Sequence, residues 1–257
     1  MTPIDQHPSG AFCWIELGAA DQQAGKEFYT GLFGWKVVDE PMGPDAYYTL
    51  FELEGRQVGA AYQLAAAEAG KPPNWMLYIA VADADAAAAK AAELGAKVHN
   101  QPFEVGPNGR MAVIEDPTGA MFCIWQPKSH KGIGLRGNGT LCWADLSTSD
   151  PARAAVFYES LFGWKLIVDE KDSSGYLHIQ NGEHMIGGIP PTGHRNPNTP
   201  SHWLPYFAVA SCSASAGTAE QLGARLILPP MTMPKVGTMS VIADPQGAVF
   251  ALFEGNG

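Results

Sequence analysis

Two short segments of the sequence place a tryptophan and an acid where they can share one face of a strand. In CWIEL the pair is Trp14 and Glu16, and in CWADL it is Trp143 and Asp145. Side chains two residues apart in a strand point to the same side, so each indole would lie beside a carboxyl group. An acid whose pKa is raised by burial can act as a general base. A salt bridge and a solvent-facing position are the two other roles open to these acids.

A tyrosine recurs at a matching position in two further apolar segments, WMLYIAV and HWLPYFAV, where it is Tyr78 and Tyr206. A phenol beside an acid can donate a hydrogen bond to a substrate. The candidate catalytic residues are therefore Glu16, Asp145, Tyr78 and Tyr206. A tyrosine in a half-buried strand can equally have a structural role.

Histidine and cysteine offer two other kinds of chemistry. Three histidines, His178, His184 and His202, fall in the second part of the chain. They would rebuild a metal site if they converged with Asp145, but their spacing does not show that they converge. Cys123 has no evident histidine partner in the sequence, which favours a buried and inert thiol.

The segments that carry these residues belong to an internal repeat. Residues 13–38 align without gaps with residues 142–167, sharing C-W, a later aspartate, F-Y and L-F-G-W-K. Residues 109–125 match residues 237–253 around V-I-x-D-P-x-G-A. A repeat of this length indicates a duplicated domain, whereas solenoid repeats are much shorter.

Each copy is predicted to run from strand to helix to further strands, twice over. Asp21 is a helix-capping residue and Gly34 a helix end, and Asp150 followed by proline marks the matching helix in the second copy. An alanine-rich helix over 84–94 and a terminal D-P-x-G hairpin complete the first copy. The expected domains are 10–127 and 139–255, and the expected linkers are 68–74, 127–140 and 190–201.

The order of these motifs resembles a known family. A strand, then D-x6-FY-x2-LFGW, an A-x-LGA helix end and a terminal DPxGA hairpin are similar to the vicinal oxygen chelate superfamily. This is the glyoxalase, bleomycin-resistance and extradiol-dioxygenase group, and the tandem copies resemble its two-copy, glyoxalase-like bacterial members. The resemblance implies an α+β fold with four βαβββ modules, paired into mixed cupped sheets in two tandem halves.

The family uses a divalent metal that polarises neighbouring oxygens of the substrate. The positions that usually carry its ligands correspond to Trp14, Met76 and Cys123 in the first copy and Trp143, Leu204 and Ala251 in the second. A hard divalent ion needs several oxygen or nitrogen donors, and these positions do not supply them. We therefore expect no metal and no other cofactor in either cleft. A divalent metal held by relocated ligands is the alternative.

The resemblance also indicates which side chains line each cleft, because the family's ligand positions face inward and strand side chains alternate. The implied ligand-binding residues are Trp14, Met76, Met121, Cys123 and Trp125 in the first copy, and Trp143, Leu204, Phe253 and His202 in the second. Aromatic walls with few polar groups suit a flat and largely apolar ligand. The tryptophans can also simply fill the space that a metal site occupies in relatives.

Composition excludes several partners. With 16 basic against 26 acidic residues, the formal charge is −10, which disfavours binding to nucleic acids and to anionic membranes. No apolar run reaches the ~18 residues that a membrane-spanning helix needs, and the N-terminus does not read as a signal peptide. We expect a cytoplasmic protein that binds a small molecule. Because the duplication supplies the pairing of modules within one chain, we expect a monomer or a weak homodimer.

Three functions remain open after this reading, because a fold does not determine an activity. The first is a metal-free binding protein that sequesters an aromatic molecule. The second is a metal-independent enzyme in the same cleft, with Glu16 or Asp145 as the base and Tyr78 or Tyr206 as the hydrogen-bond donor. The third is a metal-dependent glyoxalase-like lyase or dioxygenase with relocated ligands.

Overall fold

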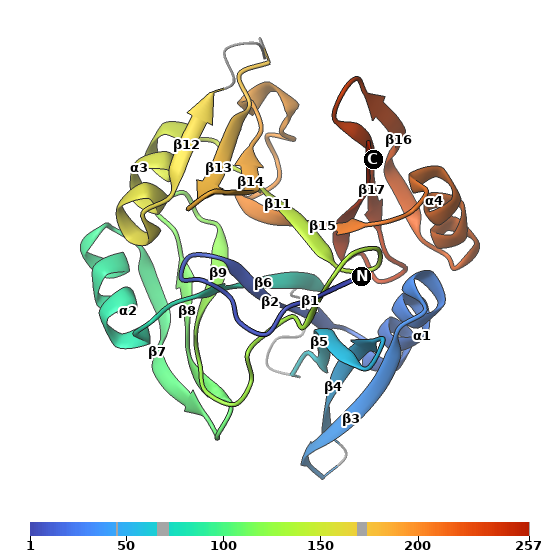
Figure 1. The fold of residues 1–257 in the computed structure, drawn as a ribbon, viewed down its shortest axis with the longest axis horizontal. Helices are drawn as coiled ribbons and strands as arrows, with labels where there is room; N and C mark the ends of the chain where they lie inside the picture. Colours follow the sequence, from blue (N-terminus) through green and yellow to red (C-terminus); the bar gives the residue numbers. More distant parts are fainter. Residues whose placement is uncertain (45, 66–71, 169–173, 257) are drawn as a thin grey trace.

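Two eight-stranded sheets, one from each copy of the repeat, form the molecule in a computed structural model that describes residues 1–44, 46–65, 72–168 and 174–256 (Figure 1). The first sheet has the order β3 (Lys36–Gly43), β4 (Ala46–Leu53), β5 (Arg56–Gln63), β2 (Phe12–Ala19), β6 (Asn74–Ala80), β9 (Met121–Pro127), β8 (Gly109–Glu115) and β7 (Lys97–Val105). The second has the order β12 (Lys165–Val168), β13 (Leu177–Asn181), β14 (His184–Ile189), β11 (Leu141–Ser147), β15 (His202–Ala208), β18 (Val249–Gly255), β17 (Gly237–Ala243) and β16 (Arg225–Met233).

Each sheet is built from two βαβββ modules of its own copy. The helices are α1 (Gln22–Phe33), α2 (Ala84–Glu93), α3 (Pro151–Phe162) and α4 (Cys212–Gln221). In the first half, β2-α1-β3-β4-β5 joins β6-α2-β7-β8-β9 through the antiparallel pair β2 and β6. Within each module the first and last strands pair in parallel, so the sheets are mixed. The expected α+β fold is confirmed, and the modules pair within a copy, which the sequence left open.

The helix boundaries agree with the predicted capping residues. Asp21 accepts a hydrogen bond from the backbone of Ala24 at the start of α1, and Gly34 ends the helix in the left-handed region at φ 69°. The second copy repeats this arrangement with Asp150 before α3 and Gly163 after it, at φ 72°. Glycine adopts this conformation without steric cost, which explains why both helices stop at the same point of the repeat.

The linkers differ in how far they pack against the sheets. Part of the expected linker at 68–74 lies outside the described residues. The one at 190–201 contains a short 3-10 turn, η2 (Thr192–His194). The one at 127–140 contains β10 (Leu135–Arg136), which pairs with the N-terminal β1 (Thr2–Pro3). None of the helices in the described part of the chain is long and apolar enough to cross a membrane.

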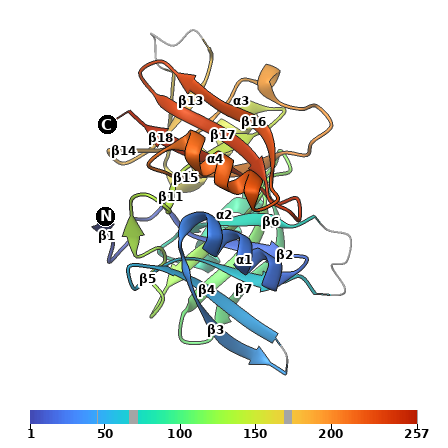
Figure 2. The same cartoon turned by 90° about the vertical axis from the view of Figure 1, so that its right-hand side faces the viewer.

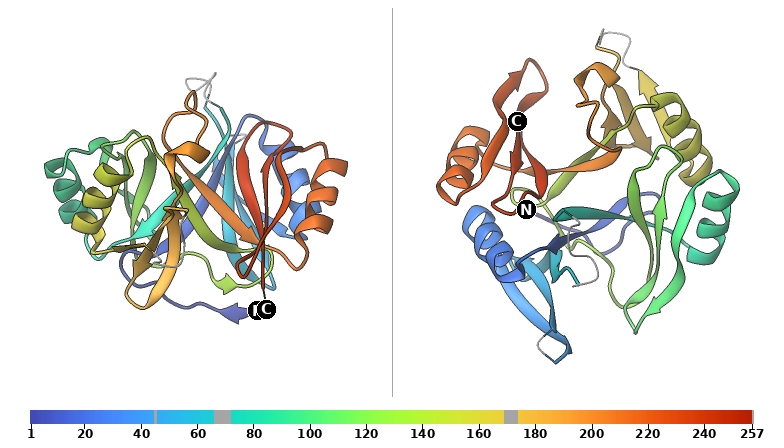
Figure 3. Two further views of the ribbon diagram at one scale, coloured as in Figure 1. Left: turned by 90° about the horizontal axis from the view of Figure 1, so that it is seen from above. Right: turned by 180° about the vertical axis from the view of Figure 1, so that it is seen from behind.

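The two halves meet through residues that define the repeat. Helix α1 contacts α4, and α2 contacts α3, on the two flanks of the molecule (Figures 2 and 3). The hydroxyl of Tyr29 donates to Asp244 of the other half at 3.0 Å, and that of Tyr158 donates to Asp116 at 2.9 Å. All four side chains are buried. The tyrosine of F-Y and the aspartate of D-P-x-G therefore hold the halves together.

The tryptophan of L-F-G-W also joins the halves. The indole of Trp35 donates to the carbonyl of Gly139, just before the second copy begins, at 2.9 Å. The indole of Trp164 donates to the carbonyl of Gly10, just before the first copy begins, at the same distance. The interface is thus made of pairs of equivalent contacts, as expected for two copies related by an approximate two-fold axis.

Candidate functional site

A compact polar cluster lies on the inner face of the first sheet. The phenols of Tyr48 and Tyr78 donate hydrogen bonds to the two carboxylate oxygens of Glu16, one to each. The indole of Trp14 donates to the hydroxyl of Tyr48 at 3.1 Å. The carboxylate is therefore surrounded by two phenols and an indole.

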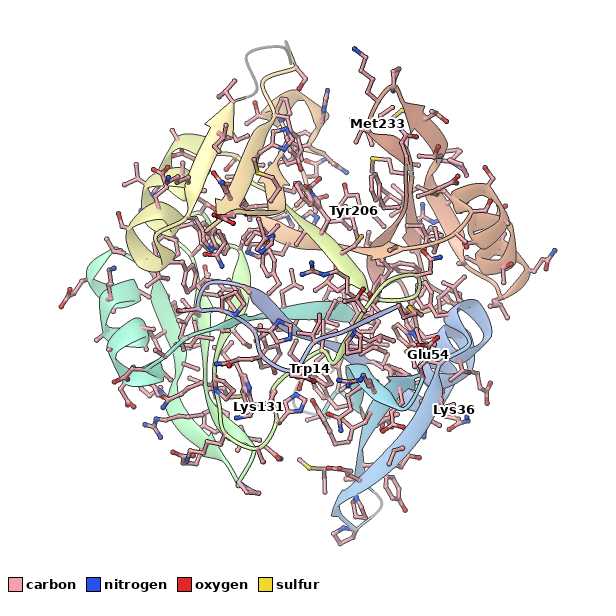
Figure 4. All side chains as sticks on the ribbon, viewed as in Figure 1. Trp14, Lys36, Glu54, Lys131, Tyr206 and Met233 are labelled. Atoms are coloured by element: carbon pink, nitrogen blue, oxygen red, sulfur yellow. The ribbon has the colours of Figure 1, made fainter. Side chains whose placement is uncertain are left out.

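The second sheet contains an equivalent cluster around Asp145. Tyr206 donates to Oδ2 of Asp145 at 2.8 Å, and Tyr176 donates to Oδ1. The indole Nε1 of Trp143 lies 2.9 Å from both Oδ1 of Asp145 and the hydroxyl of Tyr176. Aspartate is one methylene shorter than glutamate, and here the indole reaches the carboxylate directly. Figure 4 labels Trp14 in the lower half of the molecule and Tyr206 in the upper half.

Strand register explains why the four candidate catalytic residues meet. Trp14 pairs with Tyr78 across β2 and β6, and Trp143 pairs with Tyr206 across β11 and β15. Residues opposite each other in a sheet point to the same side, so each tyrosine reaches the acid two residues along the facing strand. The structure therefore brings Glu16 together with Tyr78, in the same way as it joins Asp145 with Tyr206.

The sequence reading missed the second phenol of each cluster, Tyr48 and Tyr176. Tyr48 is the third residue of β4, in AYYTLFEL, and Tyr176 directly precedes β13, in GYLHIQN, at equivalent steps of the repeat. That recurrence was the available signal. Tyr176 lies directly against Gly188, where a Cβ would be 2.0 Å from its hydroxyl oxygen. The equivalent residue in the first half is Ala60, which pairs with Glu16 as Gly188 pairs with Asp145.

Burial controls the protonation of both clusters. It raises the pKa of Asp145 to about 6, although hydrogen bonds from Tyr176, Tyr206 and Trp143 act in the opposite direction. Burial likewise raises the pKa of Glu16. Burial and the adjacent carboxylate raise the pKa values of the phenols, so the tyrosines remain neutral donors. Asp145 can thus gain or lose a proton near neutral pH.

Within the described residues, neither acid has the salt bridge that the sequence left open. Among the lysine and arginine residues that the structure describes, none forms an ion pair with Glu16 or Asp145. Asp145 is only 6% exposed and is therefore not solvent-facing, whereas Glu16 is partly exposed. The side chains that the structure describes around these carboxylates hold them by hydrogen bonds from neutral donors.

The residues at the family's metal positions do not fit a divalent ion. In the first half Met76 pairs with Glu16, and Cys123 pairs with Tyr78, so both adjoin the cluster. Burial and the charge of Glu16 raise the pKa of the Cys123 thiol well above its usual range, which keeps it protonated. One carboxylate, a thioether and a thiol are a poor donor set for a hard ion. No group of three or more histidine, cysteine or acidic side chains in the described ranges is placed to hold a metal.

Of the three histidines considered for a rebuilt site, only His178 adjoins Asp145. Its ring centroid lies 4.9 Å from that of Tyr176 and 6.3 Å from that of Trp143. His202 has its Nδ1 2.9 Å from the carbonyl of Pro200, and His184 is exposed. The histidines therefore do not converge on Asp145 as a group.

The remaining candidate ligand-binding residues differ between the halves. Trp125 is buried, whereas Phe253, its counterpart, is partly exposed. Leu204 pairs with Asp145 and is partly exposed. Met121 is partly exposed at the start of β9. Met76 and Met121 in the first half are as partly exposed as Leu204 and Val249 in the second, so the difference at these positions is confined to Trp125 and Phe253.

The chain itself covers the first cluster. The ring of His130 packs edge-on against Trp14 with a centroid distance of 4.3 Å, and Trp14 is only 2% exposed. The indole of Trp125 donates to the carbonyl of His130 at 3.2 Å, and the backbone of Ile133 donates to the carbonyl of Cys13 at 2.7 Å. Burial lowers the pKa of His130 to about 4, so this imidazole is neutral at physiological pH.

Trp143 is only partly buried, in contrast to Trp14. In the described part of the chain its ring contact is with His178, at a centroid distance of 6.3 Å, compared with 4.3 Å between Trp14 and His130. The two clusters thus have the same chemistry but expose different parts: Trp143 is partly exposed above a buried Asp145, whereas Glu16 is partly exposed beside a buried Trp14. Because the partly exposed indole offers a stacking surface, the second cluster is the candidate functional site.

The fold and the repeated motifs indicate one class of protein, and comparison with known sequences identifies the same class. The chain matches the Glyoxalase/Bleomycin resistance protein/Dioxygenase superfamily twice, over residues 12–124 and 140–252. It therefore belongs to this superfamily.

Relatives of similar length accompany this match. The "Putative glyoxylase CFP32" of Mycobacterium tuberculosis (strain CDC 1551 / Oshkosh) is 37% identical over 260 residues, covering 99% of this chain and 98% of the relative. The "Anthracycline biosynthesis protein DnrV" of Streptomyces peucetius is 31% identical over 264 residues, covering 95% and 93%.

Solved structures show the same fold at low identity. The Mn(II)-bound glyoxalase from Novosphingobium aromaticivorans has a TM-score of 0.69 and 17% identity, covering 96% of this chain and 82% of that one. The 2,3-dioxygenase LapB from Pseudomonas sp. KL28 has a TM-score of 0.66 and 14% identity, covering 97% and 94%. At these identities the likeness concerns the fold alone.

Proposed function

We propose that the protein binds a small, flat and largely apolar molecule on the inner face of the second sheet. Trp143 supplies the stacking surface and Asp145 holds a polar group of the ligand. The observation that carries this proposal is the cluster of one carboxylate, two phenols and one indole, which is built in both halves and whose indole, Trp143, is partly exposed in the second. An aromatic wall with few fixed polar groups is typical of sites for such ligands.

The names of two relatives are consistent with an aromatic ligand. DauV of Streptomyces sp. (strain C5) and DnrV are named for anthracycline biosynthesis, and anthracyclines contain fused aromatic rings. CFP32 carries the name "Putative glyoxylase", which points to a different substrate. The residues around Asp145 favour the aromatic ligand, because their donor set does not fit the metal on which glyoxalase-like chemistry depends.

Binding and metal-independent acid–base chemistry use the same residues, and one substitution separates them. The pKa of Asp145 near 6 suits a general base. Replacing Asp145 with asparagine retains the shape of the side chain and removes its proton chemistry. A binding protein keeps affinity for a neutral ligand, whereas an enzyme keeps binding and loses turnover by roughly a hundredfold or more.

Titration of the tryptophan emission with a panel of polycyclic aromatic compounds tests the proposal. A buried indole contributes on the order of 1–3 kcal/mol to a stacked ligand, so Trp143→Ala is expected to weaken binding about tenfold or more. The matched control is Trp14→Ala, which alters the covered cluster and is expected to lower stability without changing affinity. If calorimetry detects no aromatic ligand, or if Trp143→Ala leaves affinity unchanged, the proposal is wrong.

A further inference from the structure

The hydrogen bonds around Asp145 use the donors of three neighbouring side chains. The hydroxyl hydrogens of Tyr176 and Tyr206 and the indole hydrogen of Trp143 all point to the cluster itself. A phenol has one hydrogen to donate, and an indole has one. A ligand placed here therefore meets oxygen lone pairs and the faces of aromatic rings, since these donors are already engaged.

The charge of the site is also one-sided. Asp145 is buried, and no lysine or arginine in the described ranges forms an ion pair with it. An ionised carboxylate without a cationic partner is costly to bury, and a positive charge placed beside it recovers part of that cost. The faces of tryptophan and tyrosine attract cations as well.

We infer that the ligand of the second site is an aromatic molecule that carries a positively charged amino group, and that the ammonium binds beside Asp145 among Tyr176, Tyr206 and Trp143. This inference rests on the proposed function and specifies the ligand class. The charge of the whole chain acts in the same direction, because a net charge of −10 attracts cations and repels anions. An anionic ligand of the same shape is expected to be rejected.

His178 adjoins the site and can itself carry a positive charge. The imidazole ring of His178 contacts the rings of Tyr176 and Trp143. When it is charged, His178 favours the ionised form of Asp145. A protonated His178 would compete with a cationic ligand and attract an anionic one. The equivalent residue in the first half is Leu50, so His178→Leu is a natural control for this effect.

The test compares three ligands that share a naphthalene ring and differ in one group. These are 1-naphthylmethylammonium, 1-naphthalenemethanol and 1-naphthoate, titrated into the full-length protein at neutral pH by isothermal calorimetry. We expect the ammonium compound to bind at least about tenfold more tightly than the alcohol, and the carboxylate to show no binding. The preference is expected to shrink as salt rises from about 50 to about 500 mM, while the affinity of the alcohol stays constant.

Two matched variants locate the charge preference. Asp145→Asn is expected to reduce the affinity of the ammonium compound to that of the alcohol and to change the alcohol by less than about twofold. Glu16→Gln makes the same chemical change in the covered cluster and is expected to leave all three affinities unchanged. His178→Leu is expected to preserve the preference for the ammonium compound. Circular dichroism spectra confirm that each variant is folded.

The outcomes separate this inference from the proposed function. If the alcohol binds as tightly as the ammonium compound, or if Asp145→Asn retains the preference, the cationic ligand class is wrong and the aromatic site stands. If the carboxylate binds most tightly, the inference is likewise wrong. If none of the three compounds binds and Trp143→Ala affects no other aromatic ligand, both the inference and the proposed function fail.

Discussion

Replacing Asp145 with asparagine is expected to change how the stability of the protein depends on pH. Burial raises the pKa of this carboxyl group from 3.8 to about 6 in the folded state. Between these two values the folded protein binds a proton that the unfolded chain has lost. The free energy of unfolding therefore falls as pH rises through this window, and below the window the contribution is fully present.

The size of the effect follows from the two pKa values. Each pKa unit corresponds to about 1.4 kcal/mol, so the shift of Asp145 makes the folded state about 3 kcal/mol less favourable above pH 6 than below pH 4. Asparagine does not titrate, and its own effect on packing is the same at every pH. The variant is therefore expected to gain about 3 kcal/mol relative to the natural protein across this range.

Urea unfolding of both proteins, followed by circular dichroism at several pH values, measures this difference directly. Contributions from all other titrating groups largely cancel in the comparison. His178 is the exception because its charge acts on Asp145, so the pair is repeated in a His178→Leu background. Glu16→Gln is expected to show a change in the same direction, since the pKa of Glu16 is also raised. Stability curves that stay parallel between pH 4 and pH 8 would show that Asp145 is not a buried, uncompensated acid.

Three further predictions concern the second site and the interface. Gly188→Ala is expected to displace Tyr176, because the new Cβ would lie 2.0 Å from its hydroxyl oxygen. Thermal or urea unfolding is expected to show a loss of stability of about 1–3 kcal/mol. Unchanged stability and ligand affinity would contradict this. Tyr158→Phe is expected to lower the free energy of unfolding by about 1–3 kcal/mol, because Asp116 loses a buried donor and Trp203 loses its acceptor. Urea unfolding that shows no loss of stability would disprove the interface role. Analytical ultracentrifugation is expected to find a monomer or a weak dimer, since the contacts between halves are made within one chain; an obligate tetramer would refute this.

The sequence predicted the order of helices and strands because its signals are local, and the resemblance to a known family then implied how the sheets are built. Capping at Asp21 and Asp150, the glycine that ends each helix and the D-P-x-G turns all depend on residues close together in the chain. The repeat then placed these elements twice. Tyr78 and Tyr206, the tyrosines that contact the acids, could be predicted because they occupy matching positions in the two copies of the repeat.

What the sequence could not provide depends on contacts between distant segments. Tyr48 and Tyr176 reach the acids from another strand of the module, and their alignment depends on the register of β4 and on the glycine beneath Tyr176. The packing of His130 on Trp14 depends on the path of a linker that has no periodic pattern. The sequence also does not show that Tyr29 and Tyr158 donate hydrogen bonds to aspartates of the other half, because these partners are far away in the chain.

The paired contacts between the halves have a consequence for how the two sites can differ. In a symmetric dimer of a one-domain chain, every substitution occurs in both subunits, so both sites change together. Here each partner of the tyrosine–aspartate pairs is encoded separately, and the two sites are encoded separately too. One chain can therefore keep a matched interface while it covers one cluster with His130 and leaves the other accessible. Exchange of subunits cannot remove this asymmetry. Because the two halves are covalently linked, every molecule contains one covered cluster and one with a partly exposed indole.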